Sequence, residues 1–297
     1  MVSSQRSGYG GQQEGGIHLN VTFYGVRGST PCPSEANRRY GGNTACVALE
    51  VAGEEPIVLD LGTGLRFWGQ HQPLDGSFAA SALLTHIHWD HVQGLPFFVP
   101  VDRPGARLDV YGPSQVGETL EHAFNQLMRP PYFPVRASDL RGQITFHDLD
   151  AGDMAIGNAK VQVRSVPHCG PTNGYRISWD GTTVAYLSDH QAPADGSMTV
   201  AESVLELCDG VDLLIHDAQY TPEEFREKAH WGHCSVDYAV HVAREAGVRR
   251  LALFHHDPSH CDDQVDAMLA RAQGLAGCSG IDEVVAAAEG LTISFGS

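Results

Sequence analysis

The sequence predicts an α/β protein built as a four-layer αββα sandwich, with two packed sheets and helices on both outer faces. Three observations support this prediction. Short apolar runs separated by turn residues fill the first part of the chain, polar residues follow several of these runs directly, and later runs alternate with helical patterns. Strands that come first and then alternate with helices, repeated in two halves, fit such a layered sandwich. No stretch has the composition of a linker, so residues 18–297 are predicted to form one domain.

The N-terminal residues differ from the rest of the chain. Residues 1–17 are rich in Gly, Gln and Ser and have no hydrophobic period, which predicts a disordered tail. Apolar runs with glycine turns between them then predict three early strands, at 21–26, 45–51 and 57–61. The segment 60–64, Asp-Leu-Gly-Thr-Gly, ends the third run. Its glycines favour a tight turn, and a close approach of the backbone to a ligand is the alternative.

The segment 85–91, Thr-His-Ile-His-Trp-Asp-His, carries the strongest chemical signal. An apolar run at 79–84 precedes it, so the segment is expected to be the loop that leaves the end of a buried strand. Imidazole and carboxylate together suit zinc, iron or manganese. Four ligands on one short loop are more than one tetrahedral ion easily takes, which predicts two ions. The four candidates fall within six residues: His86, His88, Asp90 and His91.

Further elements follow this loop. Ser114 is a suitable N-cap for a helix that runs to about Met128. Pro130 and Pro131 follow shortly after and stop this helix. Ser235 is expected to begin an amphipathic helix, because Val236, Ala239, Val240 and Ala243 recur on one face. The remaining apolar runs predict strands at 108–111, 143–146, 160–166, 174–179, 182–187 and 251–254.

The segment 129–136 combines three prolines with two aromatic and two basic residues and has no regular period. A surface loop packed on itself is one interpretation. A substrate lid is the other, because arginine binds phosphate and an aromatic ring can stack on a base. The candidate substrate-binding residues in this lid are Arg129, Tyr132, Phe133 and Arg136.

Three more polar residues follow apolar strands directly. His168 comes after the strand that ends at 166, Asp189 after the strand at 182–187, and His255 after the strand at 251–254. All three are therefore expected to meet at one rim of the sheets. The neighbouring His256 is an alternative to His255 as the last ligand.

These motifs resemble those of the metallo-β-lactamase-fold hydrolases, whose signature is His-x-His-x-Asp-His. The resemblance covers nearly the whole chain from about residue 21 and implies the αββα fold. It implies one ion bound by His86, His88 and His168 and a second bound by Asp90, His91 and His255. Asp189 would bridge them, since a carboxylate can hold two ions about 3.5 to 4 Å apart. Zinc is the first choice, and manganese and iron are left open.

The segment 230–235, His-Trp-Gly-His-Cys-Ser, narrows the resemblance. It is similar to the phosphodiesterase branch that includes ribonuclease Z and cyclic-nucleotide phosphodiesterases, where a His-Ser-Thr motif stands at this place. The resemblance implies that His233 protonates the leaving oxygen or steadies the phosphate, and Asp90 is expected to orient the attacking water. Cys234 departs from the family's pattern, and Ser235 is left as the N-cap of the following helix. His216 and Asp217 are expected to support the metal site from behind.

Composition excludes some classes of function. The formal net charge of -17 repels nucleic acid and acidic membranes, so a nucleic-acid partner is not expected. The chain has no long apolar span and no signal-peptide pattern, which predicts a cytoplasmic protein without membrane association. Seven cysteines without Cys-x-x-Cys spacing argue against a disulfide framework, and Cys169 is expected to be a buried thiol.

The predicted function is that of a dinuclear, metal-dependent phosphodiesterase acting on a small phosphodiester such as a cyclic nucleotide. Hydrolysis of a lactone, thioester or other ester is the alternative enzyme activity, and an RNA-processing nuclease is a third. The chain lacks the long basic arm rich in Gly and Pro by which ribonuclease Z clamps tRNA. A binding protein that keeps the metals without turnover is the non-enzymatic alternative. A homodimer is left open.

Overall fold

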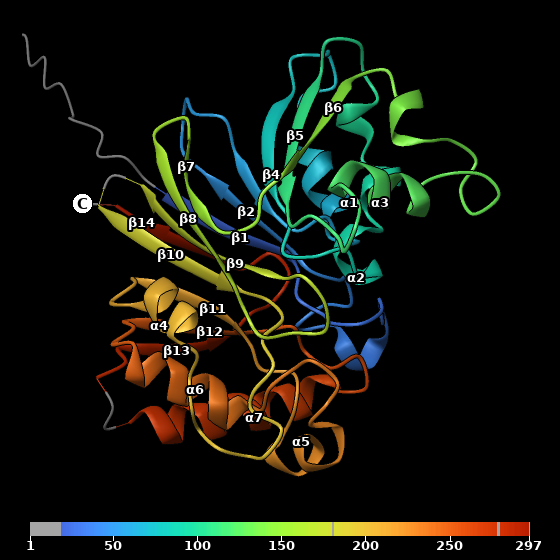
Figure 1. Ribbon diagram of the computed structural model, residues 1–297. Helices are drawn as coiled ribbons and strands as arrows, with labels where there is room; N and C mark the ends of the chain where they lie inside the picture. The colour runs from blue at the N-terminus through green and yellow to red at the C-terminus, as the bar shows by residue number, and fades with distance from the viewer. Residues whose placement is uncertain (1–18, 180, 278–279, 297) are drawn as a thin grey trace, which may run out of the picture.

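The computed structural model describes residues 19–179, 181–277 and 280–296, so the tail predicted at 1–17 lies outside the described residues. Two seven-stranded sheets pack face to face, and helices cover the outer face of each (Figure 1). This is the αββα arrangement expected from the sequence. The predicted strands are found with shifts of one or two residues at their ends.

The first sheet has the order β14-β1-β2-β3-β4-β5-β6. Its strands from β3 to β6 run parallel, whereas β1 pairs antiparallel with both β2 and β14. The C-terminal strand thus completes the sheet that the N-terminal half of the chain builds. The strands are β1 (Leu19–Gly25), β2 (Cys46–Glu50), β3 (Ile57–Leu59), β4 (Ala79–Leu83), β5 (Arg107–Gly112), β6 (Gln143–Asp148) and β14 (Thr292–Phe295).

The second sheet has the order β13-β12-β11-β10-β9-β8-β7. The four strands from β10 to β13 run parallel, and β7, β8 and β9 form an antiparallel meander beside them. The carboxyl ends of the parallel strands therefore share one edge. The strands are β7 (Gly152–Ile156), β8 (Ala159–Ser165), β9 (Asn173–Trp179), β10 (Thr182–Leu187), β11 (Leu213–Asp217), β12 (Arg250–Phe254) and β13 (Glu283–Ala286).

The helices form the two outer layers. In Figure 1, α1 and α3 lie beside the first sheet, and α4, α6 and α7 lie beside the second. The α-helices are α1 (Leu65–Trp68), α2 (Trp89–Val92), α3 (Leu120–Leu127), α4 (Glu202–Cys208), α5 (Pro222–Lys228), α6 (Val236–Glu245) and α7 (Asp262–Ala276). Short 3₁₀ helices occupy several loops: η1 (Glu35–Asn37), η2 (Gly69–His71), η3 (Leu95–Phe97), η4 (Val99–Val101) and η5 (Ala137–Asp139).

Apolar clusters hold the layers together. The central one lies between the sheets, where the ring of Phe254 is 6.1 Å from that of Phe23 and 5.7 Å from that of Tyr186. In the outer cluster beside the first sheet, Trp68 stacks on Phe98 with 5.5 Å between ring centroids. Aromatic pairs of this kind add about 0.5 to 1.5 kcal/mol each beyond the area that they bury. The core thus fixes the relative position of strands from both sheets.

Helix α6 follows the predicted pattern closely. Ser235 is its N-cap, and the Ser235 side chain accepts a hydrogen bond from the backbone N–H of Tyr238. The helix packs its apolar face against the second sheet, and four residues expected on that face are buried: Val236, Ala239, Val240 and Ala243.

The predicted start of the helix after β5 is wrong. Helix α3 begins at Leu120, and its N-cap is Thr119, whose side chain accepts from the backbone N–H of His122. Ser114 lies in the preceding loop, where its hydroxyl donates to Asp150. Ser114 and Thr119 both carry a hydroxyl group that can cap a helix. The position at which β5 ends decides which of them does so. The predicted end of the helix, just before the prolines, is confirmed.

A pair of substitutions tests this correction. Thr119→Ala removes the hydroxyl that satisfies a free N–H at the start of α3, so we expect the free energy of unfolding to fall by about 1 kcal/mol. Ser114→Ala removes only an exposed hydrogen bond and should change it by less than about 0.5 kcal/mol. Urea denaturation of both variants measures the difference. A larger loss in Ser114→Ala would contradict the assigned cap.

Several elements were not foreseen from the sequence. They are the edge strands β7, β13 and β14 and the helices α4, α5 and α7. Their apolar patterns are short or weakly periodic, and tertiary packing decides them. Among the described residues, none of the helices combines the length and the apolar character needed to cross a membrane.

Candidate metal centre

Loops from both sheets meet at one edge of the sandwich. Three of the parallel strands release a polar residue there: β4 leads to His86, β10 to Asp189 and β12 to His255. Their side chains converge. The Nε2 atom of His86 lies 3.7 Å from Asp189 Oδ2, and that of His255 lies 3.2 Å from Asp189 Oδ1. The common rim predicted from the sequence is therefore formed.

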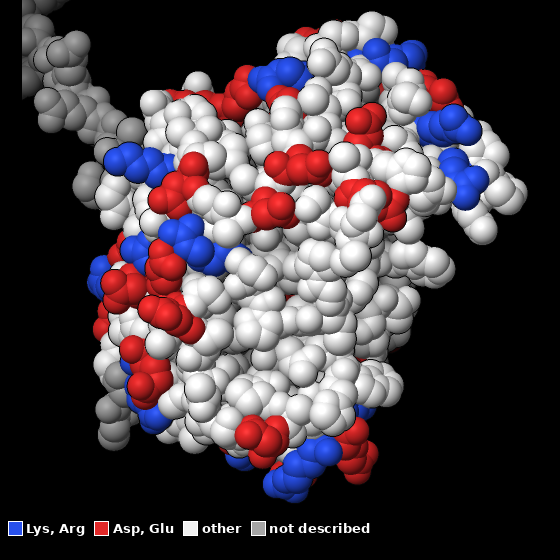
Figure 2. All heavy atoms as spheres, viewed as in Figure 1, with Lys and Arg blue, Asp and Glu red and all other residues white. Residues whose placement is uncertain are grey.

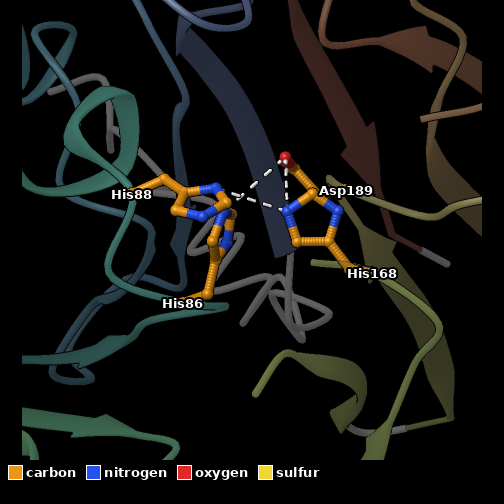
Figure 3. A group of neighbouring side chains, drawn as sticks. All are labelled: His86, His88, His168 and Asp189. Atoms are coloured by element: carbon orange, nitrogen blue, oxygen red, sulfur yellow. Dashed lines mark hydrogen bonds and ion pairs between the residues drawn. The ribbon is translucent and has the colours of Figure 1, made fainter. Parts of the chain in front are cut away.

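The first group of side chains contains His86, His88, His168 and Asp189, which offer ligand atoms that all lie within 4.8 Å of one another. Figure 3 shows these four pointing inward, with His86 and His88 on the loop after β4 and His168 on the opposite wall. His168 Nε2 is 3.3 Å from His88 Nδ1 and 3.6 Å from Asp189 Oδ2. The four thus enclose a space of the size of a metal ion.

The second group contains Asp90, His91 and His255, again within 4.8 Å of one another. Asp90 Oδ2 lies 3.2 Å from the Nε2 atom of His91 and 3.2 Å from that of His255. Asp189 Oδ1 lies 3.1 Å from His91 Nε2. Asp189 therefore directs Oδ2 to the first group and Oδ1 to the second, which is the arrangement of a carboxylate that bridges two cations.

The buried donor atoms of the two groups suit divalent cations. His86 Nε2, His91 Nε2 and Asp189 Oδ1 are buried and have no hydrogen-bond partner among the described residues. Leaving a buried polar atom without a partner costs about 1 to 3 kcal/mol, and native structures rarely do so without a reason. One cation in each group would satisfy these atoms, His86 in the first group and His91 and Asp189 Oδ1 in the second.

The electrostatics of the groups also fit metal binding. Burial, aided by the nearby imidazole of His91, lowers the pKa of His86 well below its usual value, so His86 is neutral as a ligand must be. Burial by itself would raise the pKa of the Asp189 carboxyl. The surrounding imidazoles, first that of His255, outweigh this effect and hold the pKa of Asp189 well below its usual value. His86 is thus a neutral imidazole and Asp189 an ionised carboxylate. Burial by itself would lower the pKa of His91, but the carboxylates around it, first that of Asp90, hold this pKa well above its usual value.

Asp60 holds the second group in place. It is fully buried, and its Oδ2 lies 2.8 Å from His91 Nδ1 and accepts a hydrogen bond of 2.8 Å from the Tyr186 hydroxyl. Because the carboxylate accepts the Nδ1 proton of His91, Nε2 is left to face the centre. Asp60 Oδ1 also accepts from the backbone N–H of Thr85. The glycines of 60–64 predict chiefly a turn, and the signal for this role is a carboxylate directly after a buried strand.

The segment before η1 and Gln219 also support the second group, at Asp90 and His255. The backbone N–H of Ser29 donates to Asp90 Oδ2 at 2.7 Å. Gln219 Oε1 lies 2.8 Å from His255 Nδ1 and so leaves Nε2 of that ring for a metal. Gly28 stands against the ring, and a Cβ built at this position would lie 2.4 Å from His255 Nδ1. The sequence alone assigned no role to this segment.

We therefore expect Gly28→Ala to displace the His255 ring and to weaken binding of one ion about 10- to 100-fold, as losses of support around metal ligands do. Competition with a chelator, followed by elemental analysis, measures this affinity. Gly274→Ala is the matched control: it lies within α7, a Cβ there meets nothing, and a helical Gly→Ala change adds stability. Equal metal affinity in Gly28→Ala and the wild type would refute the assigned steric role.

The structure separates the two adjacent histidines left open by the sequence. His255 lies in the second group, whereas His256 turns its Nε2 atom to the carbonyl oxygen of Ala287 at 2.9 Å. Burial lowers the pKa of His256 to about 3, so it is neutral and donates this hydrogen bond. His256 thus links two loops and has no place among the candidate ligands.

His233 lies beside the two groups. Its Nδ1 atom is 2.8 Å from Asp217 Oδ2 and 3.7 Å from Asp189 Oδ2, and its ring stacks on that of His255 at 4.9 Å. Burial by itself would lower the pKa of His233. The carboxylate of Asp217 outweighs it and raises the pKa to about 9. A carboxylate that orients an imidazole in this way is a common arrangement for proton transfer.

The fold and the candidate metal ligands agree with a match to a known protein family. Residues 57–256 match the family described as the beta-lactamase superfamily domain. The chain belongs to this superfamily. It is accordingly a metal-dependent hydrolase of the metallo-β-lactamase fold.

Among curated proteins, ribonuclease Z from Natronomonas pharaonis is 28% identical over 304 aligned residues, which cover 84% of this chain and 92% of the relative. Ribonuclease Z from Pyrococcus furiosus is 23% identical, with coverage of 82% and 87%. Two solved structures share the fold. The metallo-β-lactamase-fold protein YhfI from Bacillus subtilis has a TM-score of 0.69 at 18% identity and covers 94% of this chain and 100% of its own. A diphosphatase of the PhnP family has a TM-score of 0.66 at 19% identity, with coverage of 94% and 97%.

Within this metallo-β-lactamase-fold hydrolase, the residues after His233 have structural roles. The thiol of Cys234 is buried and donates to the backbone carbonyl of Asp217 at 3.0 Å. Ser235 caps α6, as predicted.

The prediction that Cys169 is a buried thiol is wrong. This residue is exposed, with its Sγ atom 4.0 Å from Gln191 Oε1. The glycine turn at 170 brings the chain to the surface there.

The candidate lid residues are divided by the structure. Tyr132 and Phe133 line a pocket of about 650 Å³ that also contains Trp89 of the metal loop. Arg129 and Arg136 are not part of this lining. The guanidinium of Arg129 lies over the ring of Tyr132, 5.8 Å from its centroid, and Arg136 is exposed at the start of η5. A phosphate-binding role for the two arginines stays a prediction.

Proposed function

We propose that this protein is a dinuclear phosphodiesterase that acts on a small phosphodiester such as a cyclic nucleotide. The observation that carries the proposal is the pairing of His233 with Asp217 at the edge of the candidate metal centre. A hydrolase whose leaving group departs without a proton has no need of such a pair. A phosphodiester with an alkoxide leaving group does need a proton donor.

Seven residues would hold the ions. His86, His88 and His168 surround one position, Asp90, His91 and His255 surround the other, and Asp189 spans both. When bound, two divalent cations lower the pKa of a water molecule and neutralise the charge of phosphate oxygens. Zinc is our first choice because imidazole and carboxylate suit it, and the same donors also accept manganese and iron.

Asp90 has a further role beside holding an ion. Burial would raise the pKa of Asp90, but the neighbouring imidazoles, first that of His91, hold it well below its usual value. Asp90 is therefore an ionised acceptor, and we assign it the task of orienting the attacking water. Its carboxylate is held in turn by the backbone N–H of Ser29.

His233 donates a proton to the leaving oxygen. Asp217 accepts the Nδ1 proton, which directs the Nε2 proton of the imidazolium to the substrate. General acid catalysis of this kind contributes about 10² to 10⁴ in rate. Asp217 receives further hydrogen bonds from the backbone N–H groups of His190 and Gln219, so its orientation is set before the substrate arrives.

RNA cleavage is the second candidate, because the ribonuclease Z relatives match more than four fifths of the chain. The charge argues for a smaller substrate. The chain carries a formal charge of -17, and acidic groups are spread over the face shown in Figure 2, while basic groups gather mainly at its margins. A field of this sign repels a polyanion at long range but affects a small diester much less.

A substrate panel with the metal-loaded protein tests the proposal. It contains bis-p-nitrophenyl phosphate, cyclic mononucleotides, a precursor tRNA and a lactone. We expect hydrolysis of the first two classes and little cleavage of the RNA. Efficient cleavage of the precursor tRNA would replace the proposal with the nuclease. Cleavage of the lactone alone would establish the ester hydrolase instead.

A further inference from the structure

A pocket of about 650 Å³ opens beside the metal loop, and its chemistry is unusually uniform. Trp89, Phe97, Tyr132 and Phe133 supply aromatic walls. None of the described residues that line the pocket is charged, and Gln93 and Gln126 provide the polar groups. A charged ligand group would lose its hydration there without gaining a counter-charge, which is costly. The pocket therefore favours an uncharged group.

Three of the aromatic side chains that line the pocket are largely exposed to solvent. Trp89 is 73% exposed, Phe97 60% and Tyr132 76%. Three large exposed rings around one pocket form the kind of apolar patch that marks a binding site. Other contacts hold the walls: Phe97 meets Phe133 edge to face at 5.7 Å between centroids, and the Arg129 guanidinium lies over the ring of Tyr132. The rings are thus in position before a ligand arrives.

The pocket is joined to the metal centre through the chain itself. Trp89 is the residue between two ligand candidates, His88 and Asp90, and it is the first residue of α2. None of the candidate ligands itself lines the pocket, so Trp89 is the lining residue that links it along the chain to His88 and Asp90. The pocket would take the ester substituent that stays attached to the phosphorus, or that leaves it, and the phosphate itself would remain outside the pocket.

We infer that this pocket, formed by Trp89, Phe97, Tyr132 and Phe133, binds an uncharged flat aromatic ring carried by an ester group of the substrate. The inference rests on the proposed phosphodiesterase function. It makes the protein selective for diesters that bear such a ring, because flat rings stack on aromatic side chains. A nucleobase and a simple arene share this chemistry.

A series of mixed diesters with a common p-nitrophenolate leaving group tests the selectivity. Methyl, benzyl, cyclohexylmethyl and 4-carboxybenzyl esters vary only the second substituent. We expect kcat/KM for the benzyl ester to exceed that for the methyl ester about tenfold, which corresponds to about 1.4 kcal/mol. The cyclohexylmethyl and 4-carboxybenzyl esters should lose most of this advantage. Thymidine 5′-p-nitrophenyl phosphate distinguishes a nucleobase from a simple arene as the better occupant.

Variants assign the selectivity to the pocket. Phe97→Ala should reduce the benzyl-to-methyl ratio of kcat/KM about tenfold, because one wall is removed. Leu74→Ala removes another exposed apolar side chain that does not line the pocket, and it should leave the ratio unchanged. Equal kcat/KM for the methyl and benzyl esters in the wild type, or an unchanged ratio in Phe97→Ala, would overturn the inference while leaving the phosphodiesterase in place.

A binding measurement separates this inference from the proposed function. N-phenyl-1-naphthylamine, an uncharged aromatic dye, should gain fluorescence with the metal-loaded wild type and bind about tenfold more weakly to Phe97→Ala. If no phosphodiester is hydrolysed but the dye binds in this way, the proposed function fails and the pocket's preference for uncharged rings stands. If the dye binds equally to both proteins, the pocket assignment fails whatever the catalytic result.

Discussion

Replacing His233 by alanine is expected to cut kcat for a diester with a poor leaving group, such as a ribose hydroxyl, by about 10² to 10⁴. The alkoxide must then depart without the proton that His233 supplies. The metal content should stay at the wild-type level, because Asp189 and the other six candidate ligands remain. Steady-state kinetics with a cyclic nucleotide, together with elemental analysis, measures both quantities.

The leaving group provides the internal control for this experiment. The p-nitrophenolate ion departs readily without a proton, so His233→Ala should cost much less with bis-p-nitrophenyl phosphate. Asp217→Asn should show the same dependence on the leaving group in weaker form, since the amide no longer stabilises the imidazolium of His233. His122→Ala, an exposed histidine on α3, should change neither rate. Equal losses on both substrates would mean that His233 positions the phosphate, and loss of metal would place it among the ligands.

Asp189→Ala is expected to have an effect of similar size through the metals. The carboxylate faces both groups of candidate ligands, with Oδ2 toward His168 and Oδ1 toward His91. Its removal should lower the metal content from about two ions per chain to one or fewer. Loss of a cation that stabilises the transition state by several kcal/mol corresponds to about 10³ or more in kcat/KM.

Elemental analysis after gentle purification measures the stoichiometry and identifies the metal. Asp195→Ala, which removes an exposed carboxylate farther along the same loop, is the control and should retain both ions and full activity. A wild-type protein that is fully active with one ion, together with a harmless Asp189→Ala substitution, would exclude the dinuclear arrangement.

The sequence was most informative where the chemistry is local. Four candidate ligands stand on one short loop, and the others follow apolar strands directly, so their order along the chain already indicated a common rim. The carboxyl ends of parallel strands share an edge, which is why the sequence predicts that Asp189 and His255 lie together. His168 follows β8 of the antiparallel meander, and only its place directly after an apolar strand indicated the same rim. The N-cap at Ser235 was equally predictable, because a cap acts on N–H groups only two or three residues away.

Other features depend on contacts between residues that are far apart in the chain. Asp60 meets His91 across 31 positions, and Gln219 meets His255 across 36. Gly28 affects the metal centre only because His255, directly after β12, has its ring against Gly28. The same reasoning explains the misplaced start of α3, since Ser114 and Thr119 are similar as caps and the end of β5 decides between them.

The sequence by itself determined the kind of metal chemistry and the layered fold, because ligand type and hydrophobic period are properties of short segments. Tertiary structure decided which nitrogen of each histidine faces the centre and which of His255 and His256 takes part. It also decided that the aromatic residues of segment 129–136, and not its arginines, line the pocket that contains Trp89. Hydrogen bonds and van der Waals contacts act over a few ångströms, so only the packed chain selects among partners that its sequence leaves equivalent.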